Sequence, residues 1–287
     1  MGAKVYDAQH GFIYCEAEKL KGCEIQLDYP SVGATENVML SAVFASGETY
    51  IRNAAKEPEI VDLQNFLISL GVNVSGAGTG VIRIQGTDKL KKEVEHTIIP
   101  DRIVAGTYMT AAAITGGDIY LKNVVPEHLS SVTYNLRQAG CRIDTEKRNL
   151  HIWGPARAKA IDTITTLPYP GFPTDMQAQI VALLSVARGT SIVVETVFEN
   201  RYKHVEELLR MGANIKLEGR IAIIKGVRRL TGANVTSWDL RGGAALVLAG
   251  LAAHGETVVS GVKHIDRGYE KIESKLAQVG ALIKRVD

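Results

Sequence analysis

Four polar residues stand where helical segments are expected to begin, and together they could act on a ligand. They are Ser31, Asp101, Asp175 and Asp239. Each is a residue type that accepts a hydrogen bond from a backbone N–H group at a helix start, so capping alone would explain any one of them. If the four helix starts lie near one another, their dipoles and carboxylates converge on one cleft. Such a cleft suits a ligand that carries phosphate.

The elements that must position these residues form an internal repeat. A helix rich in small residues runs into a glycine, an alternating apolar strand follows, and an amphipathic helix ends at a second glycine before another strand. The first glycines are Gly47, Gly117, Gly189 and Gly255. The second glycines are Gly71, Gly140, Gly212 and Gly280. The pattern predicts an α/β (α+β) fold of repeated β-α-β-α-β-β units, with buried small-residue helices and a left-handed second glycine after each amphipathic helix.

Composition narrows the class of protein. The 287 residues include 33 basic and 31 acidic side chains, a formal net charge of +2, so no overall field indicates a nucleic-acid or membrane-surface partner. Cys15, Cys23 and Cys141 are odd in number and lack the spacing of a metal site, which favours reduced thiols. The longest apolar run, residues 244–253, is too short to span a bilayer. We therefore expect a cytoplasmic protein without a metal site.

Four segments, in order along the chain, carry a specific resemblance. Residues 56–62, 172–179, 196–201 and 264–270 resemble successive signatures of the UDP-N-acetylglucosamine 1-carboxyvinyltransferases, the enolpyruvyl transferases that open peptidoglycan synthesis. The resemblance implies two similar domains, each of three β-α-β-α-β-β units around buried helices, with the active site between them. It implies that residues 1–99 are the remnant of an incomplete first domain and that residues 100–287 form the second, of three repeat units.

The resemblance also implies that the chain corresponds to the C-terminal two-thirds of the family. The remaining third carries a lysine and arginines that hold phosphoenolpyruvate and a mobile loop with a cysteine general acid. Cys15, Cys23 and Cys141 do not lie in a matching loop. We therefore expect the isolated chain to be inactive or severely impaired, because part of its electrostatic clamp is missing. Self-association or a complementing N-terminal segment would compensate for exposed strand edges.

The implied reaction adds the 3-hydroxyl group of UDP-N-acetylglucosamine to phosphoenolpyruvate and then expels phosphate, without a cofactor. Asp175 matches the family's general base, and such a carboxylate works best if burial or a neighbouring charge raises its pKa toward neutrality. Asp239 joins it in the catalytic set, and Arg241 and Arg267 match arginines that bind phosphoenolpyruvate. The glycines Gly242 and Gly243 are expected to loosen that helix start.

Two further groups of residues match the nucleotide-sugar site of the family. A loop facing the diphosphate corresponds to Tyr29, Pro30, Ser31, Val32 and Gly33. The residues that match the surroundings of the sugar are Asp101, Arg102 and Val197. Tyr29 departs from the family, because many members have a lysine there.

Two alternatives to a peptidoglycan enzyme of cell wall biogenesis, cell shape and division stay open. One is a remnant that binds the UDP-sugar or a partner without catalysis. The other is a sister enolpyruvyl transferase that acts on shikimate 3-phosphate. The segments 172–177 and 264–269 fit the sugar enzyme better.

Overall fold

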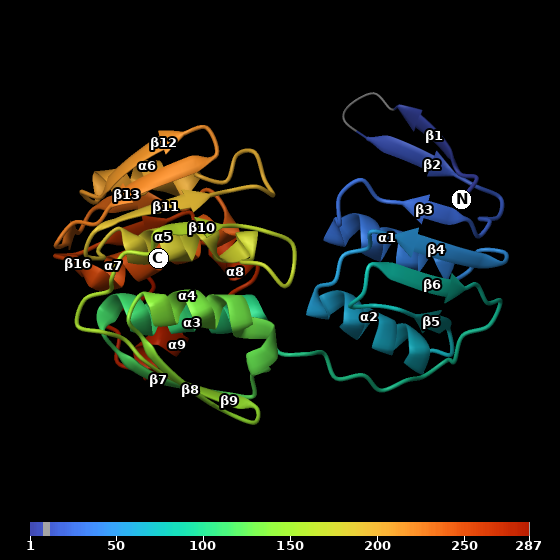
Figure 1. The fold of residues 1–287 in the computed structure, drawn as a ribbon, viewed down its shortest axis with the longest axis horizontal. Helices are drawn as coiled ribbons and strands as arrows, with labels where there is room; N and C mark the ends of the chain where they lie inside the picture. The colour runs from blue at the N-terminus through green and yellow to red at the C-terminus, as the bar shows by residue number, and fades with distance from the viewer. Residues whose placement is uncertain (8–11, 287) are drawn as a thin grey trace. The chain divides into compact units, whose positions relative to one another are not determined.

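The chain forms two compact units, Met1–Ile99 and Pro100–Asp287. The computed structural model describes residues 1–7 and 12–286. Figure 1 colours the first unit from blue to teal and the second from green to red. In the described ranges, no helix is long and apolar enough to cross a membrane.

Unit 1 contains one β-α-β-α-β-β unit, preceded by a separate antiparallel hairpin. The hairpin consists of β1 (Lys4–Asp7) and β2 (Ile13–Glu16). The following elements are β3 (Glu24–Gln26), α1 (Val32–Ala42), β4 (Glu48–Arg52), α2 (Pro58–Ser69), β5 (Asn73–Ser75) and β6 (Val81–Gln85). The sheet order is β3-β4-β6-β5, in which β3 and β4 run parallel and the other pairs antiparallel. Because strand side chains alternate between faces, Ile51, Ile82 and Ile84 are all buried in one core.

Unit 2 repeats this order. Its first repeat consists of α3 (Arg102–Thr115), β7 (Asp118–Lys122), the 3₁₀ turn η2 (Pro126–Leu129), α4 (Ser130–Gln138), β8 (Arg142–Glu146) and β9 (Asn149–Trp153). The second consists of β10 (Thr163–Thr165), η3 (Thr174–Met176), α5 (Gln177–Leu184), β11 (Thr190–Val194), α6 (Lys203–Arg210), β12 (Asn214–Glu218) and β13 (Ile221–Lys225). The third consists of β14 (Leu230–Thr231), β15 (Asn234–Thr236), α7 (Leu240–Ala252), β16 (Ala253–His254), β17 (Val258–Ser260), α8 (Lys263–Asp266) and α9 (Ile272–Gln278).

The sheets of unit 2 preserve the pairing of unit 1. The second repeat has the order β10-β11-β13-β12 and the first has β7-β9-β8. The third repeat has two short parallel pairs, β14 with β16 and β15 with β17. The α/β fold of repeated units that the sequence predicts is therefore confirmed.

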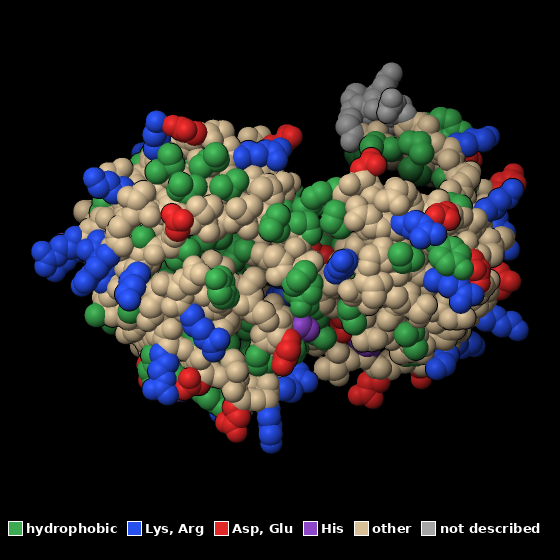
Figure 2. Space-filling view, viewed as in Figure 1, with side chains coloured by type: hydrophobic (Ala, Val, Ile, Leu, Met, Phe, Trp, Pro, Cys, Tyr) green, Lys and Arg blue, Asp and Glu red, His purple; other side chains and the backbone are tan. Residues whose placement is uncertain are grey.

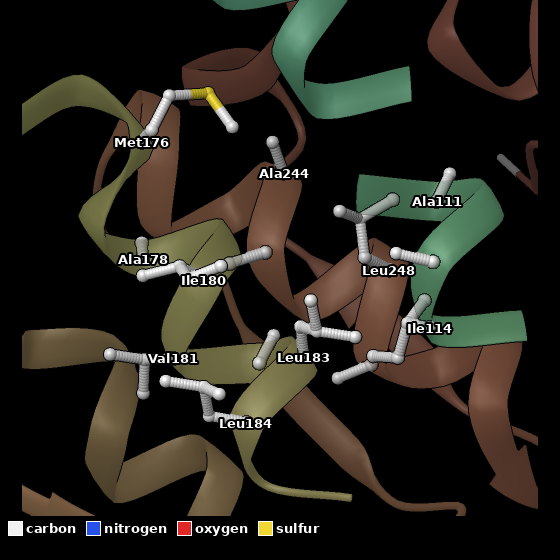
Figure 3. Close-up of a cluster of buried hydrophobic side chains, with 14 of the residues drawn as sticks. Ala111, Ile114, Met176, Ala178, Ile180, Val181, Leu183, Leu184, Ala244 and Leu248 are labelled. Carbon is white, nitrogen blue, oxygen red and sulfur yellow. The ribbon is translucent and has the colours of Figure 1, made fainter. Parts of the chain in front are cut away.

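The small-residue helices α3, α5 and α7 pack against one another in the core of unit 2. Figure 3 shows Ala111 and Ile114 of α3 beside Leu248 of α7, with Leu183 of α5 nearby. Small side chains allow the helices to approach closely, and the sheets of unit 2 cover them. The core thus fixes where all three helices begin.

The second glycine of each repeat ends its amphipathic helix in the same way. Gly71, Gly140, Gly212 and Gly280 all have positive φ angles, between 84° and 99°. In each case, the following residue donates its N–H to a carbonyl of the last helical turn, with bonds of 3.0 to 3.1 Å. This hydrogen-bond pattern is a Schellman motif, which requires a left-handed residue. The predicted left-handed glycines are confirmed at all four places.

A third set of glycines closes each complete repeat. Gly86, Gly154 and Gly226 follow β6, β9 and β13, and each donates its N–H to the carbonyl of a first-set glycine. A Cβ atom at these positions would lie 1.7 to 2.0 Å from a backbone carbonyl oxygen of the preceding helix end. Only glycine lets the strand end approach the helix end so closely.

The repeats differ from the prediction in two places. No strand in the described part of the chain precedes α3 as β3 precedes α1, and residues 281–286 after Gly280 form no strand. A single strand segment has no stable pairing of its own in water, so it needs a neighbour to become regular. The last repeat of unit 2, the fourth along the chain, therefore lacks a closing hairpin within the described residues.

Charges of both signs are interspersed over the visible face in Figure 2, in line with the small net charge. Hydrophobic side chains reach the surface at the hairpin of unit 1, where Val5, Ile13 and Tyr14 are more than half exposed. Both faces of this hairpin lack the packing that the other sheets have.

Candidate functional site

Three of the four polar residues at helix starts cap their helices. Ser31 Oγ accepts the N–H of Ala34 at 3.3 Å, and Asp101 accepts two N–H groups of α3 at 2.8 and 2.9 Å. Asp239 does the same for α7 at 3.0 and 2.8 Å. Asp175 is different, because it lies inside the 3₁₀ turn η3 and its side chain makes no capping bond. Its carboxylate is therefore available for other partners.

Two arginines hold the carboxylate of Asp175, one on each oxygen. Arg201 donates to Oδ1, and Arg241 Nη2 lies 3.4 Å from Oδ2. Burial by itself would raise the pKa of Asp175, but the two guanidinium charges and their hydrogen bonds outweigh it and hold the pKa below its ordinary value. The direction of the shift is opposite to the raised pKa that suits a general base near neutral pH, because two cations lie at this carboxylate.

A buried hydrogen-bond network holds the guanidinium group of Arg241 in place. Its Nη1 donates to the hydroxyl of Tyr269 at 3.2 Å, and that hydroxyl lies 2.9 Å from Thr107 Oγ1. The amide of Gln179 donates to both oxygens, at 3.1 and 3.3 Å. Burial works against the charge of Arg241, but Tyr269, Asp175 and Asp101 hold its pKa above the ordinary value. The network joins α3, α5 and α7 at their N-terminal halves, so it fixes the guanidinium in place.

The N-terminal end of α7 is closely packed although it contains two glycines. Asp239 caps the helix, and a Cβ atom at Gly242 would lie 2.9 Å from the Asp239 carboxylate. A Cβ atom at Gly243 would lie 2.1 Å from Ser237 Oγ. The expectation of a loosened helix start was wrong, since these glycines make room for a close cap.

A fully buried carboxylate orients the loop that carries Val197. Glu195 Oε1 accepts hydrogen bonds from Thr166 Oγ1 at 2.8 Å and from the N–H groups of Val197 and Phe198 at 2.8 and 3.1 Å. Its Oε2 accepts the hydroxyl of Thr174, next to Asp175, at 2.9 Å. One side chain thus ties the Val197 loop to the turn that holds the base candidate.

We expect Glu195→Gln to destabilise unit 2 by about 2–3 kcal/mol, because an amide places its NH₂ group against donors that a carboxylate satisfies. Urea unfolding followed by circular dichroism would measure the change. Glu199→Gln is the matched control, since Glu199 is exposed and its one ion pair among the described residues is with Arg220. Equal stability of the two variants would contradict the role of Glu195.

His204 is a buried histidine beside this site, and neither ring nitrogen has a hydrogen-bond partner in the described residues. Burial lowers its pKa to about 4, with Asp239 opposing and Arg201 reinforcing the shift. Between pH 6.5 and 4 the unfolded chain therefore binds a proton here that the folded chain does not. We expect the free energy of unfolding to fall by about 1.4 kcal/mol per pH unit as pH falls through this window. In His204→Leu the slope should decrease by one proton, and an unchanged slope would refute the assignment.

The remaining predicted residues fall into two groups. The loop Tyr29, Pro30, Ser31, Val32 and Gly33 opens α1 in unit 1. In unit 2, the guanidinium of Arg102 lies over the ring of Tyr169, 5.6 Å from its centroid. Arg267 directly follows α8, and its exposed side chain makes no ion pair within residues 1–7 and 12–286. Unit 2 therefore brings Asp101, Asp175, Asp239 and Arg241 to one end of its helix core.

Sequence reasoning missed four functional candidates of unit 2. Arg201 and Tyr269 lie within segments singled out for their resemblance, so the motif could have drawn attention to them. Gln179 lies within another such segment, residues 172–179, whereas Glu195 is a buried polar residue that no spacing rule identifies. The described residues contain no cluster of three or more side chains suited to a metal ion.

The geometry agrees with comparisons to known proteins. A family model described as EPSP synthase (3-phosphoshikimate 1-carboxyvinyltransferase) matches residues 1–276. UDP-N-acetylglucosamine 1-carboxyvinyltransferase 1 of Caldanaerobacter subterraneus subsp. tengcongensis is 59% identical over 276 residues, which cover 96% of this chain and 66% of the relative. UDP-N-acetylglucosamine 1-carboxyvinyltransferase 1 of Carboxydothermus hydrogenoformans is 58% identical over 287 residues, which cover 100% of this chain and 68% of the relative.

Solved structures show the same fold. The enolpyruvyl transferase NikO from Streptomyces tendae has a TM-score of 0.89 at 24% identity, over 99% of this chain and 69% of its own. An EPSP synthase from Acinetobacter baumannii has a TM-score of 0.72 at 21% identity, again over 99% and 69%. The chain spans about two thirds of the length of these relatives. It belongs to the EPSP synthase family of enolpyruvyl transferases, and within it to the UDP-N-acetylglucosamine 1-carboxyvinyltransferases.

Proposed function

We propose that this chain takes part in transferring the enolpyruvyl group of phosphoenolpyruvate to the 3-hydroxyl of UDP-N-acetylglucosamine, an early step of peptidoglycan synthesis in the cytoplasm. The observation that supports this proposal most directly is the environment of Asp175. Among the four helix-start residues, it is the carboxylate that caps no helix and is held by two arginines. The names of the relatives supply the two substrates.

Asp175 is the proposed general base. With a lowered pKa it is ionised at neutral pH, and its oxygens are oriented by Arg201 and Arg241. It accepts the proton of the sugar hydroxyl as that oxygen bonds to the central carbon of phosphoenolpyruvate, while the methylene carbon gains a proton from the general acid that the resemblance assigns to the remaining third of the family's length. Loss of phosphate together with a proton from the new methyl group then restores the double bond.

Arg241 is the proposed electrostatic partner of the anionic substrate. The Tyr269 and Thr107 network holds it rigidly, so little reorganisation is needed when charge moves in the transition state. Arg267, whose side chain is exposed, is a second cation proposed for phosphoenolpyruvate.

The remaining candidate residues are proposed to bind the nucleotide sugar. The loop 29–33 carries the capped start of α1, whose N–H groups suit a diphosphate. Asp101, Arg102 and Val197 are proposed for the sugar. In this proposal, Met1–Ile99 is part of a first domain and Pro100–Asp287 is the second domain of three repeats.

The test is a calorimetric titration of UDP-N-acetylglucosamine into the 287-residue chain, followed by phosphoenolpyruvate with phosphate release monitored. Saturable heat with the nucleotide sugar supports the proposed acceptor site, and phosphate release shows turnover. Binding heat without phosphate release would mean that the chain binds the nucleotide sugar but is impaired in catalysis or has none. Absence of binding would overturn the proposal.

Shikimate 3-phosphate is the matched control ligand, because the family model is described by the enzyme that uses it. We expect it to bind at least tenfold more weakly than the nucleotide sugar. Tighter binding of shikimate 3-phosphate would assign the chain to the sister reaction.

A further inference from the structure

One buried residue beside the candidate site departs from the repeat symmetry of the fold. In each complete repeat, a residue just beyond the strand that follows the small-residue helix donates its N–H to the carbonyl group that precedes the last strand of the hairpin. This residue is Ala54 in unit 1, Val124 in the first repeat of unit 2 and Glu195 in the second, with bonds of 3.2, 2.8 and 2.9 Å. All three residues are at most 5% exposed. Glu195 therefore occupies a place that the other repeats fill with an apolar core residue.

The neighbouring position on the adjacent strand changes in the same way. Thr166 donates its N–H to the last residue of β11 at 2.9 Å, as Leu27 does to the last residue of β4 at 3.0 Å. Leu27 packs against the apolar core of unit 1, whereas the Thr166 hydroxyl donates to Glu195 at 2.8 Å. A buried carboxylate costs free energy unless hydrogen bonds compensate for the lost water. Since an apolar pair is sufficient to build the same repeat in unit 1, the polar pair points to a role beyond folding.

The course of the chain after this place differs between the repeats. Asn53 and Asn123 are additional residues before the apolar position, and both are left-handed, with φ angles of 55° and 53°. In the second repeat of unit 2, strand β11 runs directly into Glu195. The carboxylate then turns the chain by accepting the N–H groups of Val197 and Phe198 at 2.8 and 3.1 Å. The loop that follows therefore takes its direction from a side chain, where the other repeats use a left-handed residue.

The contacts of Glu195 form a closed ring with the ion pair of Asp175 and Arg201. Its Oε2 accepts the hydroxyl of Thr174, which directly precedes Asp175. Its Oε1 accepts the N–H of Phe198, and the guanidinium carbon of Arg201 lies 4.8 Å from the centroid of the Phe198 ring. Arg201 closes the ring through its bond to Asp175 Oδ1. One buried carboxylate thus contacts the segments that carry both members of the pair.

We propose that Glu195 is a positioning residue, which holds Asp175 and Arg201 together and ties them to the Val197 loop proposed for the sugar. This inference rests on the proposed function and adds to it a residue that acts through Asp175 and Arg201. Because one side chain anchors both the turn of the base and the loop of the sugar, its loss should loosen both at once.

The first test replaces the polar pair by the apolar pair of unit 1, in the double variant Thr166→Leu plus Glu195→Ala. Leu27 and Ala54 occupy the matching places of a folded repeat, and removing both polar partners leaves neither of them unsatisfied, so the variant should keep the circular dichroism spectrum of the unchanged chain. Calorimetry should show binding of UDP-N-acetylglucosamine that is weaker by about tenfold. Equal affinity in the folded variant would overturn the proposal.

The second test needs no substrate. Burial raises the pKa of Asp175, but the charges of Arg241 and Arg201 hold it below its ordinary value. Thr174→Val breaks only the link between Glu195 and the turn of Asp175. In this variant, and in the double variant, Arg201 should be held less firmly against the carboxylate, so the pKa of Asp175 should rise. Carbon-13 NMR of chain labelled at the aspartate carboxyl groups measures it.

Thr163→Val is the matched control, because it removes an exposed hydroxyl from β10 in the same repeat. It should change neither the affinity for the nucleotide sugar nor the pKa of Asp175. A merely structural role of Glu195 would lower the free energy of unfolding without moving the pKa of Asp175 in the folded variants, and that result would overturn the proposal.

The two tests also separate this inference from the proposed function. If the unchanged chain does not bind UDP-N-acetylglucosamine, the proposed function fails. A rise of the Asp175 pKa in Thr174→Val and in the double variant would still support the positioning role, and an unchanged pKa would still refute it.

Discussion

In a form of the protein that turns over phosphoenolpyruvate, Asp175→Asn should reduce the rate of phosphate release by about 10²- to 10⁴-fold, because asparagine cannot accept the proton of the sugar hydroxyl. The isosteric amide keeps the shape of η3, so the affinity for UDP-N-acetylglucosamine should change by less than about threefold. Phosphate release at saturating substrates and calorimetric titration measure the two effects.

A second readout of Asp175→Asn does not depend on turnover. The substitution leaves Arg201 and Arg241 without their shared counter-charge, so inorganic phosphate should bind more tightly than it does to the unchanged chain. Asp144→Asn is the matched control, since Asp144 is exposed and, in the part of the chain that the structure describes, pairs with Arg142 alone. Unchanged phosphate affinity in Asp175→Asn, or equal effects of both substitutions, would contradict the arrangement of base and cations.

Gly86→Ala should lower the free energy of opening of the β4–β6 pair by about 3 kcal/mol. The added Cβ atom would lie 1.7 Å from the carbonyl oxygen of Ala45, so either the strand end or the helix end must move. Hydrogen exchange of the amides of β4 and β6 measures this local opening directly.

Gly80→Ala is the control for this prediction, because a Cβ atom there meets nothing within 4 Å and the residue does not have a positive φ angle. It should leave the opening free energy within about 0.5 kcal/mol of the unchanged chain. Similar protection in the two variants would show that the glycine contact contributes little to closing the repeat.

Local signals in the sequence identified the repeat correctly. Gly71 and its counterparts end helices because a left-handed residue is needed within one turn of the helix end, and Asp101 and Asp239 cap because their partners lie two and three residues away. Such interactions depend on neighbours along the chain, so residue type and spacing are sufficient to predict them.

Interactions between distant segments were decided only by the tertiary structure. Asp175 has the same residue type and a similar position to Asp239, yet it pairs with Arg201 and Arg241, 26 and 66 residues away. That pairing lowers the pKa of Asp175, and the role of Glu195 likewise depends on Thr166 and Thr174, 29 and 21 residues away. Local sequence thus determined where each helix begins and ends, and long-range packing determined which charges and strand edges meet.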